Sequence, residues 1–251
     1  MAEDNKRDIH SSDKEMTFFE HLSELRLRIV RALIGVCLGL LICLIFTDPL
    51  VNFILILPAK KAGLELQNLR PFGLIYLYFQ VGLIGGIVLS LPNILYQFWK
   101  FISPALKVSE RKYVTSIVSF SSFSFILGIV FAYFVMLPMT LNVVAKFGNP
   151  YVKNQFAIDE YMSIILSIML TAGLVFELPM ISFFLTKLGI LKPAFMRKYR
   201  RHAIVVIMIL AAILTPGTDP VSQMILAVPL LILYEISIIV SKLSVKKTVI
   251  P

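Results

Sequence analysis

Glu177 is the residue whose position most needs a chemical reason. It lies inside the apolar run LTAGLVFELPMISFFL, residues 170–185, two residues before Pro179. A charged side chain at the centre of a membrane helix costs about 2.5–3.5 kcal/mol on insertion scales, so such residues usually face a protein interior or a water-filled cavity. Pro179 cannot donate a backbone hydrogen bond to Val175, which predicts a kink beside the glutamate. Two interpretations remain open: a functional carboxylate in a cavity, or a buried carboxylate bonded within the chain.

Few other residues could support enzyme chemistry. The three histidines, His10, His21 and His202, all lie outside the apolar stretches. The sequence contains no HExxH, GxSxG or phosphate-binding GxxxxGK[ST] motif. We therefore expect no catalytic residue, no metal site and no cofactor, and a protein that is not an enzyme.

The elements that position Glu177 must be membrane helices. The 251 residues are 58% hydrophobic and 16% charged, with a mean hydropathy of +0.85, which is too apolar for a soluble domain. A hydrocarbon core of about 30 Å needs about 20 helical residues, and candidate stretches occur at residues 29–46, 72–91, 114–138, 161–185, 203–214 and 221–240. The fifth stretch reaches only about 18 Å as a helix, so a re-entrant segment with five crossings is an alternative to six.

The distribution of basic residues favours six crossings. Six helices place 19 of the 24 Lys and Arg residues on one side of the membrane and 5 on the other. Because basic loops stay in the cytoplasm, we expect both termini there. The sequence thus predicts an all-α polytopic domain over residues 17–241, between a disordered cytosolic tail (1–16) and a second cytosolic tail (242–251). The net charge of +9 then reflects orientation and attraction to anionic membrane lipids, not nucleic-acid binding.

Acidic residues flank the predicted cytoplasmic boundary. Thr17 and Glu20 form a capping-box pattern, which predicts a helix that begins near Thr17. Glu24 precedes Arg28 by four residues, the spacing of an ordinary helical ion pair. Glu110 lies in a charged loop where a carboxylate is usually solvated. The local pattern alone favours a structural role for both Glu24 and Glu110.

Glycines and aromatic residues are predicted to serve packing and anchoring. Gly35–Gly39 and Gly82–Gly86 have the GxxxG spacing that permits close helix approach, which predicts packing within the chain. Trp99 follows an apolar stretch and is expected to anchor at the membrane surface.

Several motifs in fixed order give the chain a family resemblance. They are EHLSELRLR before the first stretch, PNILYQFWKFISPAL followed by SERK, GIVFAYFVMLP, FELP around Glu177, LTPGTDPVSQ between the last two stretches and PLLILYEI in the sixth. In this order they resemble the TatC family, the receptor and core component of twin-arginine protein translocation. The resemblance covers nearly the whole chain after Thr17 and implies a glove-like six-helix bundle with short helices 5 and 6. The segment LRPFGLIY at 69–76 departs from the family pattern at Arg70 and Gly73.

The resemblance implies a function and its residues. Folded proteins bearing twin-arginine signal peptides would dock at Glu24 and Glu110, with Arg26 shaping the site, and TatA/TatB-type single-span proteins would assemble for export driven by the proton-motive force. Glu177 would look into the concave groove. A polar cluster for the partner helix would include Thr215 and Gln223, with Asp219 in the same hairpin. The resemblance also implies oligomerisation within a receptor complex, in a bacterial cytoplasmic (inner) membrane.

Two other functions are weighed against this one. A proton-coupled carrier of small solutes could use Glu177 as its proton site, and a purely structural scaffold is the third possibility.

Overall fold

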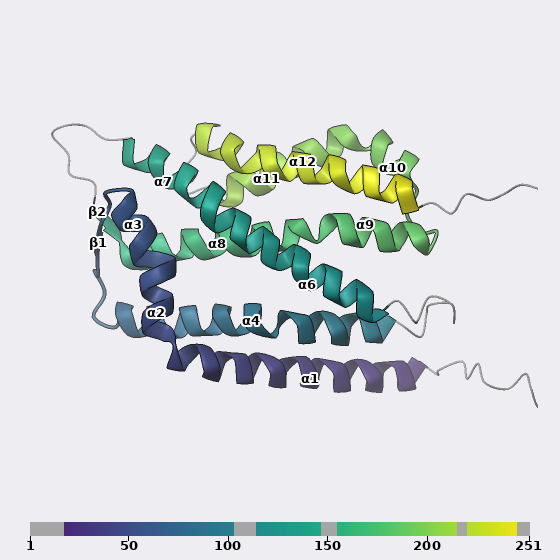
Figure 1. The fold of residues 1–251 in the computed structure, drawn as a ribbon, viewed down its shortest axis with the longest axis horizontal. Helices are drawn as coiled ribbons and strands as arrows, with labels where there is room; N and C mark the ends of the chain where they lie inside the picture. The colour runs from purple at the N-terminus through teal and green to yellow at the C-terminus, as the bar shows by residue number, and fades with distance from the viewer. Residues whose placement is uncertain (1–17, 103–113, 147–154, 215–219, 245–251) are drawn as a thin grey trace, which may run out of the picture.

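The computed structural model describes residues 18–102, 114–146, 155–214 and 220–244, and most of them are helical (Figure 1). In this part of the chain, five helical segments are long and apolar enough to cross a membrane. They are α1 (Phe18–Ile45), α4 (Gly73–Ile102), α6 with η3 and α7 (Val114–Phe131, Ala132–Met136 and Leu137–Lys146), α8 with α9 (Ile158–Phe176 and Leu178–Lys187) and α12 (Pro220–Ser244). The short fifth stretch is also helical: α11 (Arg200–Leu214) follows the short α10 (Pro193–Lys198). The predicted all-α membrane fold is confirmed, with one correction: α11 is short, but α12 has 25 residues, so the expectation of a short sixth helix is wrong.

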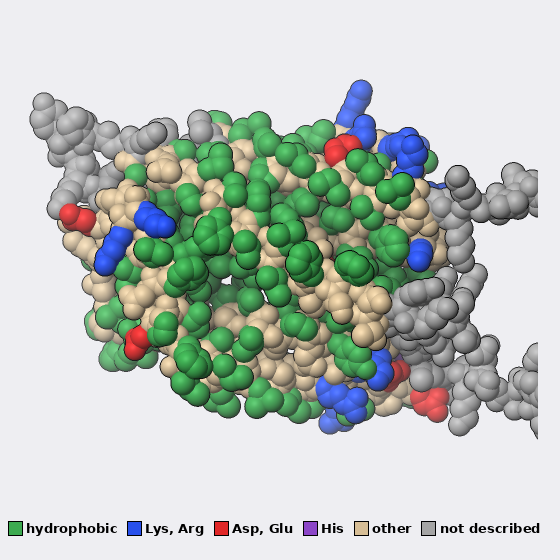
Figure 2. Space-filling model, in the orientation of Figure 1, with side chains coloured by type: hydrophobic (Ala, Val, Ile, Leu, Met, Phe, Trp, Pro, Cys, Tyr) green, Lys and Arg blue, Asp and Glu red, His purple; other side chains and the backbone are tan. Residues whose placement is uncertain are grey.

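The helices run back and forth between two ends of the bundle. Figure 1 shows that α1 begins and α12 ends at the same end, an arrangement that fits six passes rather than five. We call this the basic end, because its described residues include Arg26, Arg28, Lys100, Lys187, Lys192, Arg197, Lys198, Arg200, Arg201 and Lys242. Figure 2 shows most of the visible basic side chains there.

Helices α1 and α4 approach each other closely because glycines meet at their crossing. A Cβ added to Gly86 would lie 2.5 Å from the backbone nitrogen of Leu40. A Cβ added to Gly39 would lie 2.5 Å from the carbonyl oxygen of Gly86. Neither position has room for a side chain, so the predicted packing role of these GxxxG pairs is confirmed here.

Short elements close the end opposite the basic end. After α1 come α2 (Thr47–Val51), η1 (Asn52–Ile56, a π-helix) and α3 (Leu57–Lys61). Strand β1 (Glu65–Gln67) then pairs in parallel with β2 (Gln155–Ala157), a small sheet that the sequence did not predict because each strand has only three residues.

The departure from the family pattern at 69–76 also lies at this end. Arg70 Nε lies 3.1 Å from Asp159 Oδ2 in the first turn of α8, which ties the loop before α4 to the strand-and-helix junction after β2.

The buried core has two parts. The larger surrounds Tyr161, which is 2% exposed and whose hydroxyl donates to the carbonyl oxygen of Leu55 at 3.1 Å. The smaller contains Trp99, whose ring meets that of Phe184 edge to face with centroids 4.2 Å apart. Since Trp99 is only 3% exposed, the prediction that it anchors at the membrane surface is wrong. Helix α4 continues past Pro92 to Ile102, so Trp99 lies on a helix that packs in the bundle.

The outer surface is apolar between the charged ends, as Figure 2 shows. Helix α1 is the extreme case: only 11% of its most apolar stretch is buried, so most of this helix faces lipid. A hollow of about 380 Å³ opens among η1, α4, α6 and α8, with Ile54, Val81, Ile129 and Met162 in its walls (Figure 2). This hollow gives the bundle its concave, glove-like form.

Candidate functional site

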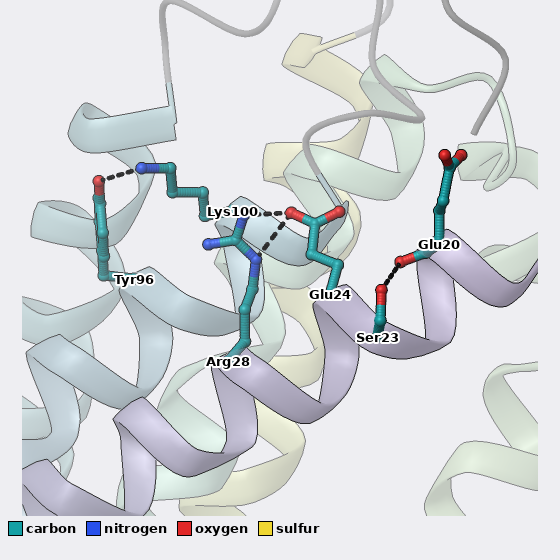
Figure 3. Close-up of polar contacts among 6 residues, drawn as sticks. All are labelled: Glu20, Ser23, Glu24, Arg28, Tyr96 and Lys100. Carbon is teal, nitrogen blue, oxygen red and sulfur yellow. Dashed lines mark hydrogen bonds and ion pairs between the residues drawn. The ribbon is translucent and has the colours of Figure 1, made fainter. Parts of the chain in front are cut away.

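Glu24 lies on α1 near the basic end and is held by its predicted partner. Arg28 Nε donates to Glu24 Oε1 at 3.0 Å, and Arg28 Nη2 contacts the same oxygen (Figure 3). The two side chains are largely buried, with exposed fractions of 17% for Glu24 and 11% for Arg28. The helical spacing that predicted this ion pair is therefore confirmed.

The pair leaves one atom of each residue unused. Glu24 Oε2 and Arg28 Nη1 are buried and have no hydrogen-bond partner within the described residues. A buried polar atom without a partner costs about 1–3 kcal/mol, and more when it carries charge. Glu24 therefore presents an acceptor that a further N–H donor would stabilise. A guanidinium group, with its planar fork of donors, is well suited to it.

The end of α4 completes the surroundings of Glu24. Figure 3 shows Tyr96 and Lys100 on the neighbouring helix α4, where Lys100 Nζ donates to the Tyr96 hydroxyl at 3.1 Å. His21 of α1 stacks on Phe101 of α4 with ring centroids 4.4 Å apart. The His21–Phe101 contact joins the start of α1 to the last turn of α4.

Arg26 and Glu110 are the other two predicted signal-binding residues. Arg26 is exposed on α1. Glu110 lies outside the described residues, four positions before α6 begins at Val114.

Glu177 lies at a break in the fourth long helical segment. It ends α8 and precedes α9, and its backbone N–H donates to the carbonyl oxygen of Leu174 at 3.1 Å, one residue closer than in an α-helix. The interruption predicted from Pro179 is thus confirmed.

The side chain of Glu177 points into the protein. It is 6% exposed, and Ser121 Oγ on α6 donates to its Oε2 at 2.6 Å. Its Oε1 is buried with no hydrogen-bond partner within the described ranges. Of the two interpretations of Glu177, bonding within the chain accounts for one oxygen and leaves the other available.

Ser121 is a site residue that sequence reasoning missed. It lies in the stretch SFSSFSF, where several serines alternate with phenylalanines and no pattern singles one out. Its partner is 56 residues away, and only the rotation of α6 against α8 brings the two together.

The predicted partner-binding hairpin joins α11 and α12. Gln223 lies in the first turn of α12, and its Nε2 donates to the carbonyl oxygen of Met208 on α11 at 2.9 Å. Thr215 and Asp219 lie outside the described residues.

Comparisons with known proteins agree with the family resemblance. The family model described as TatC, Sec-independent protein translocase protein, matches residues 20–229. A Sec-independent protein translocase protein TatC from Carboxydothermus hydrogenoformans is 38% identical over 92% of this chain and 94% of its own length. The TatCy protein of Bacillus subtilis is 35% identical over 93% of this chain and 91% of its length. A chloroplastic TATC of Pisum sativum is 37% identical over 91% of this chain and 64% of its own.

The fold leads to the same family. A crystal structure described as the twin-arginine translocase receptor TatC superimposes with a TM-score of 0.81 and 33% sequence identity, covering 90% of this chain and 99% of that one. The chain therefore belongs to the TatC family of Sec-independent protein translocase proteins, and it is a multi-pass membrane protein.

Proposed function

We propose that this chain is the signal-receiving subunit of its translocase and that Glu24 binds one of the two signal-peptide arginines at the basic end. The observation that supports the proposal is the buried Oε2 of Glu24, which lacks a partner within the described residues. Because Arg28 contacts only Oε1, a guanidinium that reaches Oε2 would donate to it without displacing Arg28. Charge-assisted bonds of this kind are among the strongest that side chains make.

Glu110 is proposed as the second carboxylate, on the strength of the family motif SERK alone. Arg26, which lies between Glu24 and Arg28 in sequence and is exposed on α1, is proposed to shape the site rather than to bind an arginine. Two carboxylates for two guanidinium groups match the charge of the ligand.

The remaining parts of the proposal concern setting and partners. The basic end faces the cytoplasm of a bacterium, both chain termini lie there, and the membrane is the inner one. TatA/TatB-type single-span helices dock at the α11–α12 hairpin through Thr215, Gln223 and Asp219, and several copies assemble in one receptor complex. The chain catalyses no covalent reaction, and the proton-motive force drives export.

The alternative of a small-solute carrier receives no support from the comparisons, because the relatives and the matching structure are translocase proteins. The carrier also needs Glu177 in a water-filled path, whereas its side chain is 6% exposed.

The test is the affinity of a twin-arginine signal peptide for purified variants. Glu24→Ala should weaken binding by about one to two decades, since bonds to charged groups contribute about 1.5–3 kcal/mol. Glu110→Ala should act similarly, and the double variant should show no detectable capture. A twin-lysine peptide should bind poorly to every variant, because an ammonium group lacks the planar fork.

Two controls separate recognition from folding. Glu20→Ala removes the same charge one turn earlier on α1, where Figure 3 shows the carboxylate directed away from Glu24, and should leave affinity unchanged. Arg28→Ala frees Oε1 as well as Oε2 of Glu24 and should preserve or raise affinity. A correctly folded double variant that still prefers arginine at full affinity would show that the signal is read elsewhere.

A further inference from the structure

A crevice on the outer side of the bundle is lined mainly by apolar side chains and shares no residue with the proposed signal site. It lies between α6 and α9, has a volume of about 430 Å³, and is walled by Ile117, Phe120, Met180, Phe183 and Phe184. Volumes of this size are typical of sites for small molecules, which occupy about 300–1,000 Å³. The crevice opens onto a lipid-facing flank, where Phe120 is 65% exposed.

The crevice has a polar mouth at one end. Lys187, the last residue of α9, and Ser116, near the start of α6, both line it at the basic end. Lys187 is the one charged residue among the described residues that line the crevice. Its Nζ lies 4.9 Å from the centroid of the ring of Phe183, which also lines the crevice. From Lys187 to Pro179 the apolar wall extends about 12 Å along α9, at about 1.5 Å per residue.

We propose that this crevice binds an anionic phospholipid, with part of an acyl chain between α6 and α9 and the phosphate group paired with Lys187 and bonded by Ser116. A long apolar slot with a cation at the level of the headgroups complements such a lipid in both charge and polarity. Lys side chains near helix ends extend naturally to that level.

A peptide segment fits the crevice less well than a lipid chain. An extended peptide carries an N–H and a C=O at every residue, and each needs a partner in an apolar environment. Among the described residues, the polar side chains that line the crevice besides Lys187 are Ser116 and Ser124. An acyl chain has no polar groups to satisfy. The proposal is independent of signal recognition at Glu24.

The single tryptophan of the sequence provides a direct test. Trp99 is buried against Phe184, which lines the crevice, with ring centroids 4.2 Å apart. Bromine atoms on a lipid chain quench indole fluorescence when they come close. The full chain is placed in phosphatidylcholine vesicles, and lipids with brominated chains replace part of the bilayer, either as phosphatidylglycerol or as phosphatidylcholine.

We expect brominated phosphatidylglycerol to quench Trp99 at lower mole fraction than brominated phosphatidylcholine. Lys187→Gln should reduce this preference about fivefold, the effect of one basic residue near an anionic surface. Lys192→Gln, which removes an exposed charge at the same end away from the crevice, should leave the preference unchanged. Ser124→Phe, which fills the crevice, should reduce quenching by both lipids.

Three results would overturn the proposal. Equal quenching by the two brominated lipids would show that the crevice does not select a headgroup. An undiminished preference for phosphatidylglycerol in Lys187→Gln would show that Lys187 does not bind the headgroup. Relief of quenching by a stoichiometric signal peptide, with no headgroup preference, would identify a peptide as the occupant. The affinity of Lys187→Gln for a signal peptide should equal that of the original chain. A failure of the lipid proposal is therefore distinguishable from a failure of signal binding at Glu24.

Discussion

Replacing Ser121 tests whether the hydrogen bond to Glu177 stabilises the membrane bundle. Ser121→Ala removes the one donor that the described residues provide to this carboxyl group and leaves both of its oxygens buried. Ser122→Ala is a matched control on the same helix. The Ser122 hydroxyl is also buried, at 7% exposure, but it has no hydrogen-bond partner within the described part of the chain.

The size of the effect follows from the geometry. Hydrogen bonds between membrane helices contribute about 0.6 kcal/mol on average and at most about 1.7 kcal/mol. The 2.6 Å distance and the 6% exposure of Glu177 place this bond near the upper limit. We expect Ser121→Ala to lower the free energy of unfolding by about 1.5 kcal/mol, roughly tenfold in the equilibrium constant. Ser122→Ala removes an unsatisfied hydroxyl and should change stability by less than about 0.5 kcal/mol.

The assay is unfolding in mixed micelles by titration with sodium dodecyl sulfate, followed by the loss of helical circular dichroism. A double-mutant cycle supplies the decisive comparison. In a Glu177→Ala background, Ser121→Ala should cost little further stability, whereas a Glu177→Gln background should retain part of the interaction because the amide oxygen still accepts a bond. Transport should follow the same order, with Glu177→Ala more impaired than Glu177→Gln. Equal losses for Ser121→Ala and Ser122→Ala, or a loss that persists in Glu177→Ala, would refute the reasoning.

Two further predictions concern helix packing and partner docking. Gly86→Ala should destabilise the α1–α4 contact by about 1–3 kcal/mol in the same titration, because its Cβ would lie 2.5 Å from the backbone of Leu40. Gly82→Ala meets only the side chains of Leu44 and Leu40, which can move, and should cost clearly less; equal costs would contradict the backbone argument. Thr215→Val combined with Gln223→Leu should weaken crosslinking to a TatA/TatB-type helix and leave signal binding intact. Unchanged crosslinks would exclude the hairpin as the docking site.

Hydropathy and charge predicted much of the fold because the membrane imposes them on every helix. The six apolar stretches all became helices, and the start predicted near Thr17 agrees with α1 beginning at Phe18. The Glu24–Arg28 pair was predictable because both residues lie on one helix. In each case the physical cause acts locally along the sequence.

Contacts between segments were not predictable in this way. The Ser121–Glu177 bond and the burial of Trp99 depend on how far each helix rotates about its axis, which a uniformly apolar sequence leaves undetermined. Pairing of β1 with β2 joins two three-residue strands 90 positions apart and has no periodic signal. Glu110, Thr215 and Asp219 were assigned from the family motifs, and they remain predictions.

The short length of α11 imposes an elastic deformation on the surrounding bilayer. At about 1.5 Å per residue, the 15 residues of α11 extend about 22 Å, roughly 8 Å less than a typical hydrocarbon core of about 30 Å. The bilayer beside α11 must thin to match, at a cost of a fraction of a kcal/mol for each ångström. That elastic cost falls when another short helix replaces the lipid at this face. The membrane would thus select neighbours of α11 by their length, and this selection should persist when the polar contact of Gln223 is removed.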